Sequence, residues 1–102
     1  MFRNSQDRIE EHAKIHQVLG NPSRLCILCA LAEHEMSVGD IAEQIGATLQ
    51  NTSQHLRLMK DKGVVDARRD GQSIFYRIAR SETGENCKQM LAILNQKTHT
   101  HS

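Results

Sequence analysis

Apolar residues recur at helical spacing along most of the chain, and glycine, proline and polar residues separate the segments. Residues 5–19 predict a first helix, which a Gly-Asn-Pro turn ends. Pro22 then suits the first position of a second helix, where its missing N–H does no harm. From Leu25 to Ala32 this second helix is apolar nearly all round, so we expect it to be buried at the centre of the domain.

Two more helices are predicted after it, with a tight turn at Gly46 between them. Ser37 is the predicted N-cap of the first, a short helix. Thr48 is the predicted N-cap of the second, longer helix, and Gly63 its C-terminal stop. Residues 37–63 therefore predict a helix-turn-helix.

The longer helix has one narrow apolar stripe, formed by Leu49, Leu56 and Met59 with Thr52 in the step between. We expect it to dock on the core along this edge only. Short amides, hydroxyls and cations occupy the other faces: Gln50, Asn51, Ser53, Gln54, His55, Arg57 and Lys60.

The periodicity changes from helix to strand after the longer helix. Two β-prone runs within residues 64–78 flank the Asp-Gly dipeptide at 70–71, which predicts a hairpin with a type I′ turn. We expect Arg68, Arg69 and Gln72 to cluster at the hairpin tip. A basic hairpin in this position is the wing of a winged helix-turn-helix.

A last helix is predicted over residues 82–97, and the polar tail after it is expected to fray. The chain then forms a single domain over residues 1–102. We predict a mostly α winged helix-turn-helix with a β-hairpin wing, five helices and two strands. The apolar face of the last helix carries Met90, Leu91, Ile93 and Leu94.

Composition narrows the class of protein. The 102 residues include no Trp and only one Tyr and two Phe, so the core must be aliphatic, and a core this modest is often extended by dimerisation. No apolar run approaches the roughly 20 residues that span a bilayer, and the first residues lack an apolar signal segment. We therefore expect a cytoplasmic protein without a membrane partner.

Charge is distributed unevenly although the net charge is only +1. Residues 57–80 hold seven Lys/Arg against three Asp/Glu, whereas residues 1–56 hold four against seven. A basic zone directly after a polar helix is typical of a protein that binds a polyanion. A charged, solvated surface without a partner is the alternative.

The polar helix and the basic hairpin together indicate double-stranded DNA. Amide side chains can hydrogen-bond base edges in a major groove, and hydroxyls and cations suit phosphates. His55 either contacts DNA or bonds a neighbouring backbone group and holds the helix in place. The predicted DNA-binding residues are Gln50, Asn51, Ser53, Gln54, His55, Arg57, Arg68, Arg69 and Gln72.

Three segments carry a family resemblance: Leu19-Gly20-Asn21-Pro22-Ser23-Arg24-Leu25, Ser53-Gln54-His55-Leu56 with Lys62-Gly63-Val64-Val65, and Arg68-Arg69-Asp70-Gly71-Gln72 with Phe75-Tyr76. Across residues 19–78 they resemble the ArsR family of bacterial repressors. The resemblance implies a homodimer paired through the helices at 6–19 and 82–97. It also implies an inverted-repeat operator and an effector that loosens the DNA.

The resemblance also indicates where effectors would act. The family's arsenic and lead/cadmium sensors place thiolates around the positions of Ser37 and Gly39, where this chain has no cysteine. Its sulfide- and persulfide-responsive members carry one cysteine in the second helix, which Cys29 matches, and one late in the last helix. Cys87 lies early in that helix, and the late position is nearer His99.

Cys26 and Cys29 lie three residues apart in an apolar helix, which leaves three interpretations open. They are inert, buried core residues, or Cys29 acts with Cys87 in redox or sulfur chemistry, or they join a metal site. As an effector, we favour a thiol-reactive sulfur or redox species over a metal.

A metal site is the weaker alternative. The family's zinc site is not matched, because Arg80, Glu82, Ile93 and Gln96 stand near its ligand positions. No cofactor is required, but a divalent metal stays open at a second cluster, whose imidazoles would suit zinc, nickel or cobalt. Two exposed histidines and a loose tail are the simpler interpretation of this cluster: His12, His16, His99 and His101.

These observations favour a DNA-binding repressor under effector control. The alternative is a winged-helix protein-interaction module without sequence-specific DNA binding. An enzyme is not expected, because the chain has no glycine-rich phosphate loop, paired carboxylates or nucleophile–base pair.

Overall fold

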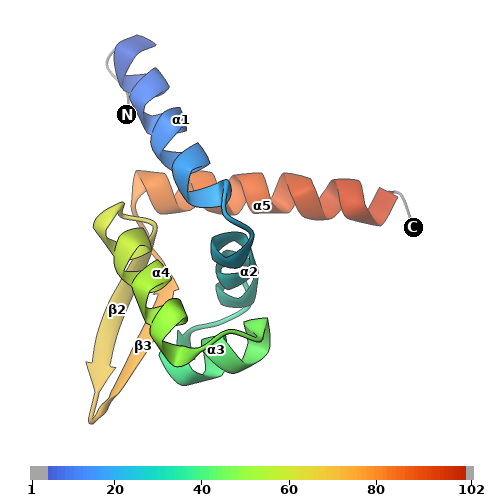
Figure 1. Ribbon diagram of the computed structural model, residues 1–102. Helices are drawn as coiled ribbons and strands as arrows, with labels where there is room; N and C mark the ends of the chain where they lie inside the picture. Colours follow the sequence, from blue (N-terminus) through green and yellow to red (C-terminus); the bar gives the residue numbers. More distant parts are fainter. Residues whose placement is uncertain (1–4, 101–102) are drawn as a thin grey trace.

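The fold is known from a computed structural model, which describes residues 5–100, with side chains for residues 6–93. It contains five helices and a small antiparallel sheet (Figure 1). The elements in chain order are α1 (Ser5–Leu19), α2 (Pro22–Leu31), β1 (Met36–Ser37), α3 (Val38–Ile45), α4 (Leu49–Asp61), β2 (Val65–Asp70), β3 (Ser73–Ile78) and α5 (Glu82–Thr100). The predicted winged helix-turn-helix is confirmed.

The sheet has three strands, so the prediction of two was wrong. β1 pairs with β3, which places β3 between β1 and β2, with Met36 opposite Tyr76 and Ser37 opposite Phe75. A strand of two residues is too short to show alternation in the sequence. This pairing ties the hairpin to the segment between α2 and α3.

The predicted helix starts are confirmed by their caps. Asn21 accepts a hydrogen bond from the backbone N–H of Arg24 at 3.2 Å, and Pro22 takes the first position of α2. The Ser37 hydroxyl caps α3 in the same way. Thr48 caps α4 by accepting from the backbone N–H of Asn51 at 3.1 Å, so local chemistry sets where each helix begins.

The helix-turn-helix and the hairpin turn at glycines with positive φ, at Gly46, Gly63 and Gly71. The two loop residues of the hairpin are Gly71 and Gln72, since Asp70 pairs with Ser73. A type I′ turn needs positive φ at both central positions, but only Gly71 has it. The predicted type I′ turn was therefore wrong, and the pattern agrees with type II′, which has glycine first.

The core lies between α2, α3, α4 and the sheet, and residues of α1 and α5 such as Val18 and Cys87 also belong to it. α2 contributes Ile27, Leu28, Ala30 and Leu31, while its other face, with both of its cysteines, is exposed. The expectation of a helix buried all round was wrong, because α1 and α3 cover only part of α2.

α4 docks on the core through one edge, as predicted, but the buried edge begins at Thr52 and not at Leu49. Thr52, Leu56 and Met59 are completely buried, whereas Leu49 is 56% exposed. Leu49 lies in the first turn of α4 and does not belong to the core cluster, so its assignment to the buried stripe was wrong.

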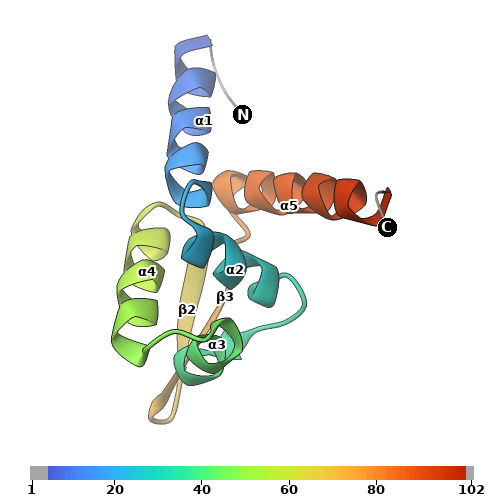
Figure 2. The same ribbon diagram turned by 45° about the vertical axis from the view of Figure 1, so that its right-hand side comes forward.

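α1 and α5 project from the rest of the fold in different directions (Figures 1 and 2). The start of α4 and the tip of the hairpin lie at the opposite end of the molecule from α1. The radius of gyration is 14.0 Å, above the roughly 13 Å of a compact domain of this length. α5 continues to Thr100, past its predicted end at residue 97. None of the helices in the described residues is long and apolar enough to cross a membrane.

The start of α5 packs tightly on the end of β3. The Ser81 hydroxyl donates to the Gly63 carbonyl at 2.8 Å and accepts from the backbone N–H of Gly84 at 3.1 Å. Gly84 is buried, and a Cβ atom there would lie 2.1 Å from the carbonyl oxygen of Ala79. Gly84 therefore permits this approach of two backbones, which no other residue would allow.

We expect Gly84→Ala to lower the free energy of unfolding by about 1–3 kcal/mol, because a backbone must move to admit the methyl group. Gly39→Ala is the matched control, since a Cβ on this exposed helical glycine meets nothing within 4 Å. The control should gain up to about 1 kcal/mol from helix propensity. Urea denaturation measures both, and equal stability of the two variants would contradict the close packing.

Candidate nucleic-acid interface

The outward face of α4 is defined by the edge that is buried. Thr52, Leu56 and Met59 fix the rotation of the helix against the core. Five of the predicted DNA-binding residues then lie exposed: Gln50, Asn51, Ser53, Gln54 and Arg57. Within the described part of the chain, their side chains make no hydrogen bond or ion pair, so their polar groups are free to bind a ligand.

Part of this face is a shallow, open hollow. It is lined by Leu49, Gln50, Ser53, Gln54 and Arg57. Spacings of three and four residues, as between Gln50, Ser53 and Gln54 or between Ser53 and Arg57, make these side chains neighbours on the surface of α4. The hollow combines amide donors and acceptors, a hydroxyl, one cation and one apolar side chain. Such a surface can match the edges of base pairs.

His55 lies at the flank of this face and is half-buried. Its ring makes no hydrogen bond with any residue that the structure describes. The alternative in which His55 bonds a neighbouring backbone group is therefore not observed, and the DNA-contacting role stays a prediction.

Arg68 of the hairpin is already bound within the protein. Its Nε and Nη2 atoms donate to the two carboxylate oxygens of Glu35 at 2.8 and 2.7 Å. The guanidinium also lies 5.0 Å from the centre of the Phe75 ring, with Asp70 at 3.8 Å. The hydrogen bonds from Arg68 hold the pKa of Glu35 below its ordinary value. Arg68 thus spans β3 and joins β2 to the residue before β1.

Arg69 differs from Arg68 although the two are adjacent. Successive residues of a strand point to opposite faces, so the two side chains diverge. Arg69 is exposed and makes no ion pair with the residues that the structure describes, and Gln72 is exposed in the turn. The expectation that these three residues cluster was wrong, because strand alternation and Glu35 direct Arg68 elsewhere.

The three thiols fall into two environments. Cys26 and Cys29 are exposed on α2, so the interpretation as buried core residues was wrong for both. Partial burial, and secondly the neighbouring Cys26, raise the pKa of Cys29. Cys87 is completely buried in α5, and burial together with the carboxylate of Glu11 raises its pKa to about 11. The charged neighbour of Cys87 is thus a carboxylate on α1.

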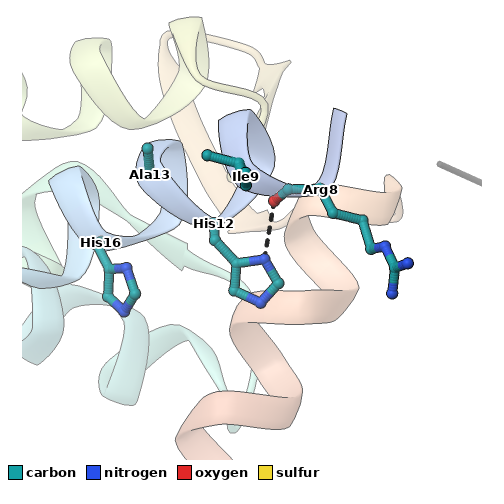
Figure 3. A pocket seen from close by; sticks show the side chains of 5 residues that line it. All are labelled: Arg8, Ile9, His12, Ala13 and His16. Atoms are coloured by element: carbon teal, nitrogen blue, oxygen red, sulfur yellow. Dashed lines mark hydrogen bonds between the residues drawn. The ribbon is translucent and has the colours of Figure 1, made fainter. Parts of the chain in front are cut away.

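The histidine cluster is only partly visible. His12 and His16 project from the same side of α1, and the Nδ1–H of His12 donates to the Arg8 carbonyl at 2.9 Å (Figure 3). Among the residues that the structure describes, no three His, Cys, Asp or Glu side chains are grouped to hold a metal. The side chain of His99 and all of His101 lie outside the described residues.

Comparison with known proteins places this architecture. Residues 21–67 match the family described as bacterial regulatory protein, arsR family. The biofilm growth-associated repressor of Xylella fastidiosa is 35% identical over 80 residues, which cover 78% of this chain and 70% of that protein. The chain belongs to the ArsR family. The resemblance expected from three short segments is confirmed, and it extends beyond them to both outer helices.

Two further comparisons cover nearly the whole chain. The transcriptional activator HlyU of Vibrio cholerae is 30% identical over 96 residues, covering 91% of this chain and 85% of that protein. A solved homodimeric winged helix-turn-helix DNA-binding domain from Mycobacterium bovis has a TM-score of 0.78 and 31% identity. The match covers 97% of this chain and 90% of that chain. The matched family is one of bacterial regulatory proteins, and these relatives are named as regulators of transcription and not as enzymes.

Sequence reasoning missed two residues of this site. Glu35 lies 33 positions from Arg68, and nothing in the pattern of either segment indicates their pairing. Leu49 was assigned to the core by its periodicity. Its position in the first turn after the cap was the available signal, because a helix end can extend beyond the body that it packs on.

We expect iodoacetamide to alkylate Cys26 and Cys29 quickly and Cys87 slowly in the folded protein, as followed by mass spectrometry. The thiolate is the reactive form, so below its pKa of about 11 the rate at Cys87 should rise about tenfold for each pH unit. Cys87→Ser should show only the two fast reactions. Equal rates for all three thiols at pH 7 would contradict the burial of Cys87.

Proposed function

We propose that the chain is a homodimeric repressor that binds an inverted-repeat operator in double-stranded DNA and is released from it by an effector. The exposed polar face of α4 carries this proposal, because its amides and hydroxyl have no partner among the described residues and its opposite edge is buried in the core. The hairpin tip lies at the same end of the molecule (Figure 2). A protein-interaction module would not need a face so rich in side chains that can hydrogen-bond the edges of bases.

In this proposal α4 enters the major groove with its N-terminal half. That half of a recognition helix usually contacts the base edges. Gln50, Asn51 and Gln54 read bases, since an amide can form two hydrogen bonds with adenine. Ser53, His55 and Arg57 bind phosphates or nearby base edges and set the position of the helix.

The hairpin binds DNA outside the major groove. Arg69 and Gln72 are exposed at its tip and suit a phosphate or the minor groove. Arg68 is proposed to act mainly by holding the hairpin in shape, because Glu35 occupies its fork of donors.

α1 and α5 are proposed to form the dimer interface. Ile9 on α1 and Ile93 on α5 are 63% and 53% exposed, and a second copy packed on these helices would remove their apolar surface from water. The buried Oε2 atom of Glu11 on α1 has no hydrogen-bond partner among the residues that the structure describes, so a donor from a second copy would satisfy a group that is costly to bury alone. The relative from Mycobacterium bovis is homodimeric. A two-fold dimer in turn requires an inverted-repeat site.

For the effector we propose thiol chemistry with a sulfur or redox species. Cys26 and Cys29 are open to a soluble reagent, whereas Cys87 is closed off and holds its proton. Modification would therefore begin on α2, and Cys87 would join only after α1 and α5 separate. A metal held by His12 and His16 is the alternative. The hydrogen bond of His12 to the Arg8 carbonyl uses only Nδ1, so Nε2 is left to bind a metal.

We expect Gln50→Ala and Gln54→Ala each to weaken binding to the protein's own upstream DNA by about 1–3 kcal/mol, and to random DNA far less. Gln44→Ala on α3 is the matched control and should leave both affinities unchanged, because this exposed glutamine lies outside the proposed DNA contacts and the proposed dimer interface. Fluorescence anisotropy with labelled duplexes measures the affinity of each variant and of the unmodified protein for each DNA. Equal weakening on both DNAs would argue against base reading, and the absence of any binding would support the protein-interaction module.

Salt dependence should separate the two hairpin arginines. Arg69→Ala should flatten the plot of log affinity against log salt by about one unit for each phosphate that the variant no longer neutralises. Arg68→Ala should weaken binding with a smaller change of slope, because its charge is already paired with Glu35. A slope change in Arg68→Ala as large as that in Arg69→Ala would show that Arg68 binds phosphate itself.

A further inference from the structure

Leu49 is an apolar side chain exposed where the proposed function places DNA. Among the described residues, the exposed large hydrophobics are Ile9, Leu49 and Ile93. Ile9 and Ile93 lie on the two outer helices, so a dimer interface accounts for them. Leu49 lies on α4, at the other end of the molecule, and that interface cannot cover it (Figure 1).

The position of Leu49 is held firmly by the cap before it. The Thr48 hydroxyl accepts from the backbone N–H of Asn51 at 3.1 Å, and the Thr48 carbonyl accepts from the hydroxyl of Thr52 at 2.8 Å. Thr52 is completely buried, so the first turn of α4 is anchored to the core. In an α-helix the Cα–Cβ bond leans toward the N-terminus, so the side chain of Leu49 points toward the N-terminal end of α4.

Leu49 also shares a surface with residues suited to base edges. It lines the open hollow together with Gln50, Ser53, Gln54 and Arg57. Each of these four neighbours is polar, so Leu49 is the apolar point of a polar face. A surface of this kind has one natural counterpart in the major groove, where thymine presents a methyl group beside hydrogen-bonding atoms.

We propose that Leu49 contacts the 5-methyl group of a thymine in each operator half-site and so determines the base preferred there. Adenine, guanine and cytosine carry no such group in the major groove. The contact removes apolar surface of both partners from water and thereby favours A·T or T·A at one position. The inference rests on the proposed function, because it assumes that α4 enters the groove.

The size of the effect follows from one methyl group. Burying a single apolar carbon corresponds to about a fourfold change in affinity. Replacing the contacted thymine by uracil removes the methyl group and leaves every hydrogen-bonding atom in place. We therefore expect the change in one half-site to weaken binding of the unmodified protein about fourfold.

The experiment begins with the operator sequence that the dimer selects from randomised duplexes. Each thymine of the selected duplex is then replaced in turn by uracil, and affinities are measured for the unmodified protein, Leu49→Ala and Leu49→Met. At one thymine in each half-site, replacement by uracil should weaken binding of the unmodified protein and of Leu49→Met. Leu49→Ala should bind the thymine duplex and the uracil duplex equally. Leu49 is exposed and outside the core cluster, so the variants should keep their melting temperatures.

Two results would overturn the inference while leaving the proposed function in place. The first is that the unmodified protein binds every uracil duplex as tightly as the thymine duplex. The second is that Leu49→Ala still binds the uracil duplex more weakly, in which case another side chain contacts the methyl group. If no sequence is enriched over random DNA, the proposed function itself fails, and that outcome is distinct from both.

Discussion

Burial of Thr52, Leu56 and Met59 is the contact on which the proposed DNA interface depends, because it sets the rotation of α4 about its own axis. Each residue of a helix turns the face by about 100°, so a shift of one position would carry the polar face into the core. The cap at Thr48 and the stop at Gly63 set the two ends of α4. Three buried side chains and two helix ends thus suffice to fix which side of α4 carries the amides.

The hairpin depends on interactions outside itself. An isolated two-stranded hairpin is marginally stable in water, and here a third strand and the pairing of Arg68 with Glu35 hold it against the body. One cation of the basic segment therefore serves the shape of the wing. A count of charges along the sequence overstates how many of them are free to meet a polyanion, and only the partners of each side chain correct it.

Features that depend on neighbouring residues were predictable from the sequence, and features that depend on distant ones were not. Helix starts such as Thr48 follow from a side chain bonding a backbone three positions later. The exposure of Leu49 and of Cys29 depends instead on where the covering elements end. The pairing of Glu35 with Arg68 and the two-residue strand β1 both require the folded sheet, which no local pattern contains. The DNA-facing side of α4 was accessible because helical periodicity already separates it from the buried edge.

The hydroxyl of Ser81 joins the last residues of the helix-turn-helix to the first turn of α5. It donates to the Gly63 carbonyl and accepts from the Gly84 N–H, so one side chain holds the two segments together. Gly84 lies against Ala79 at the same place, so the first turn of α5 is packed directly on the backbone that follows β3. A displacement of the first turn of α5 would therefore reach Gly63, just after α4, through this one hydroxyl, which couples the outer helix to the helix that carries the polar face.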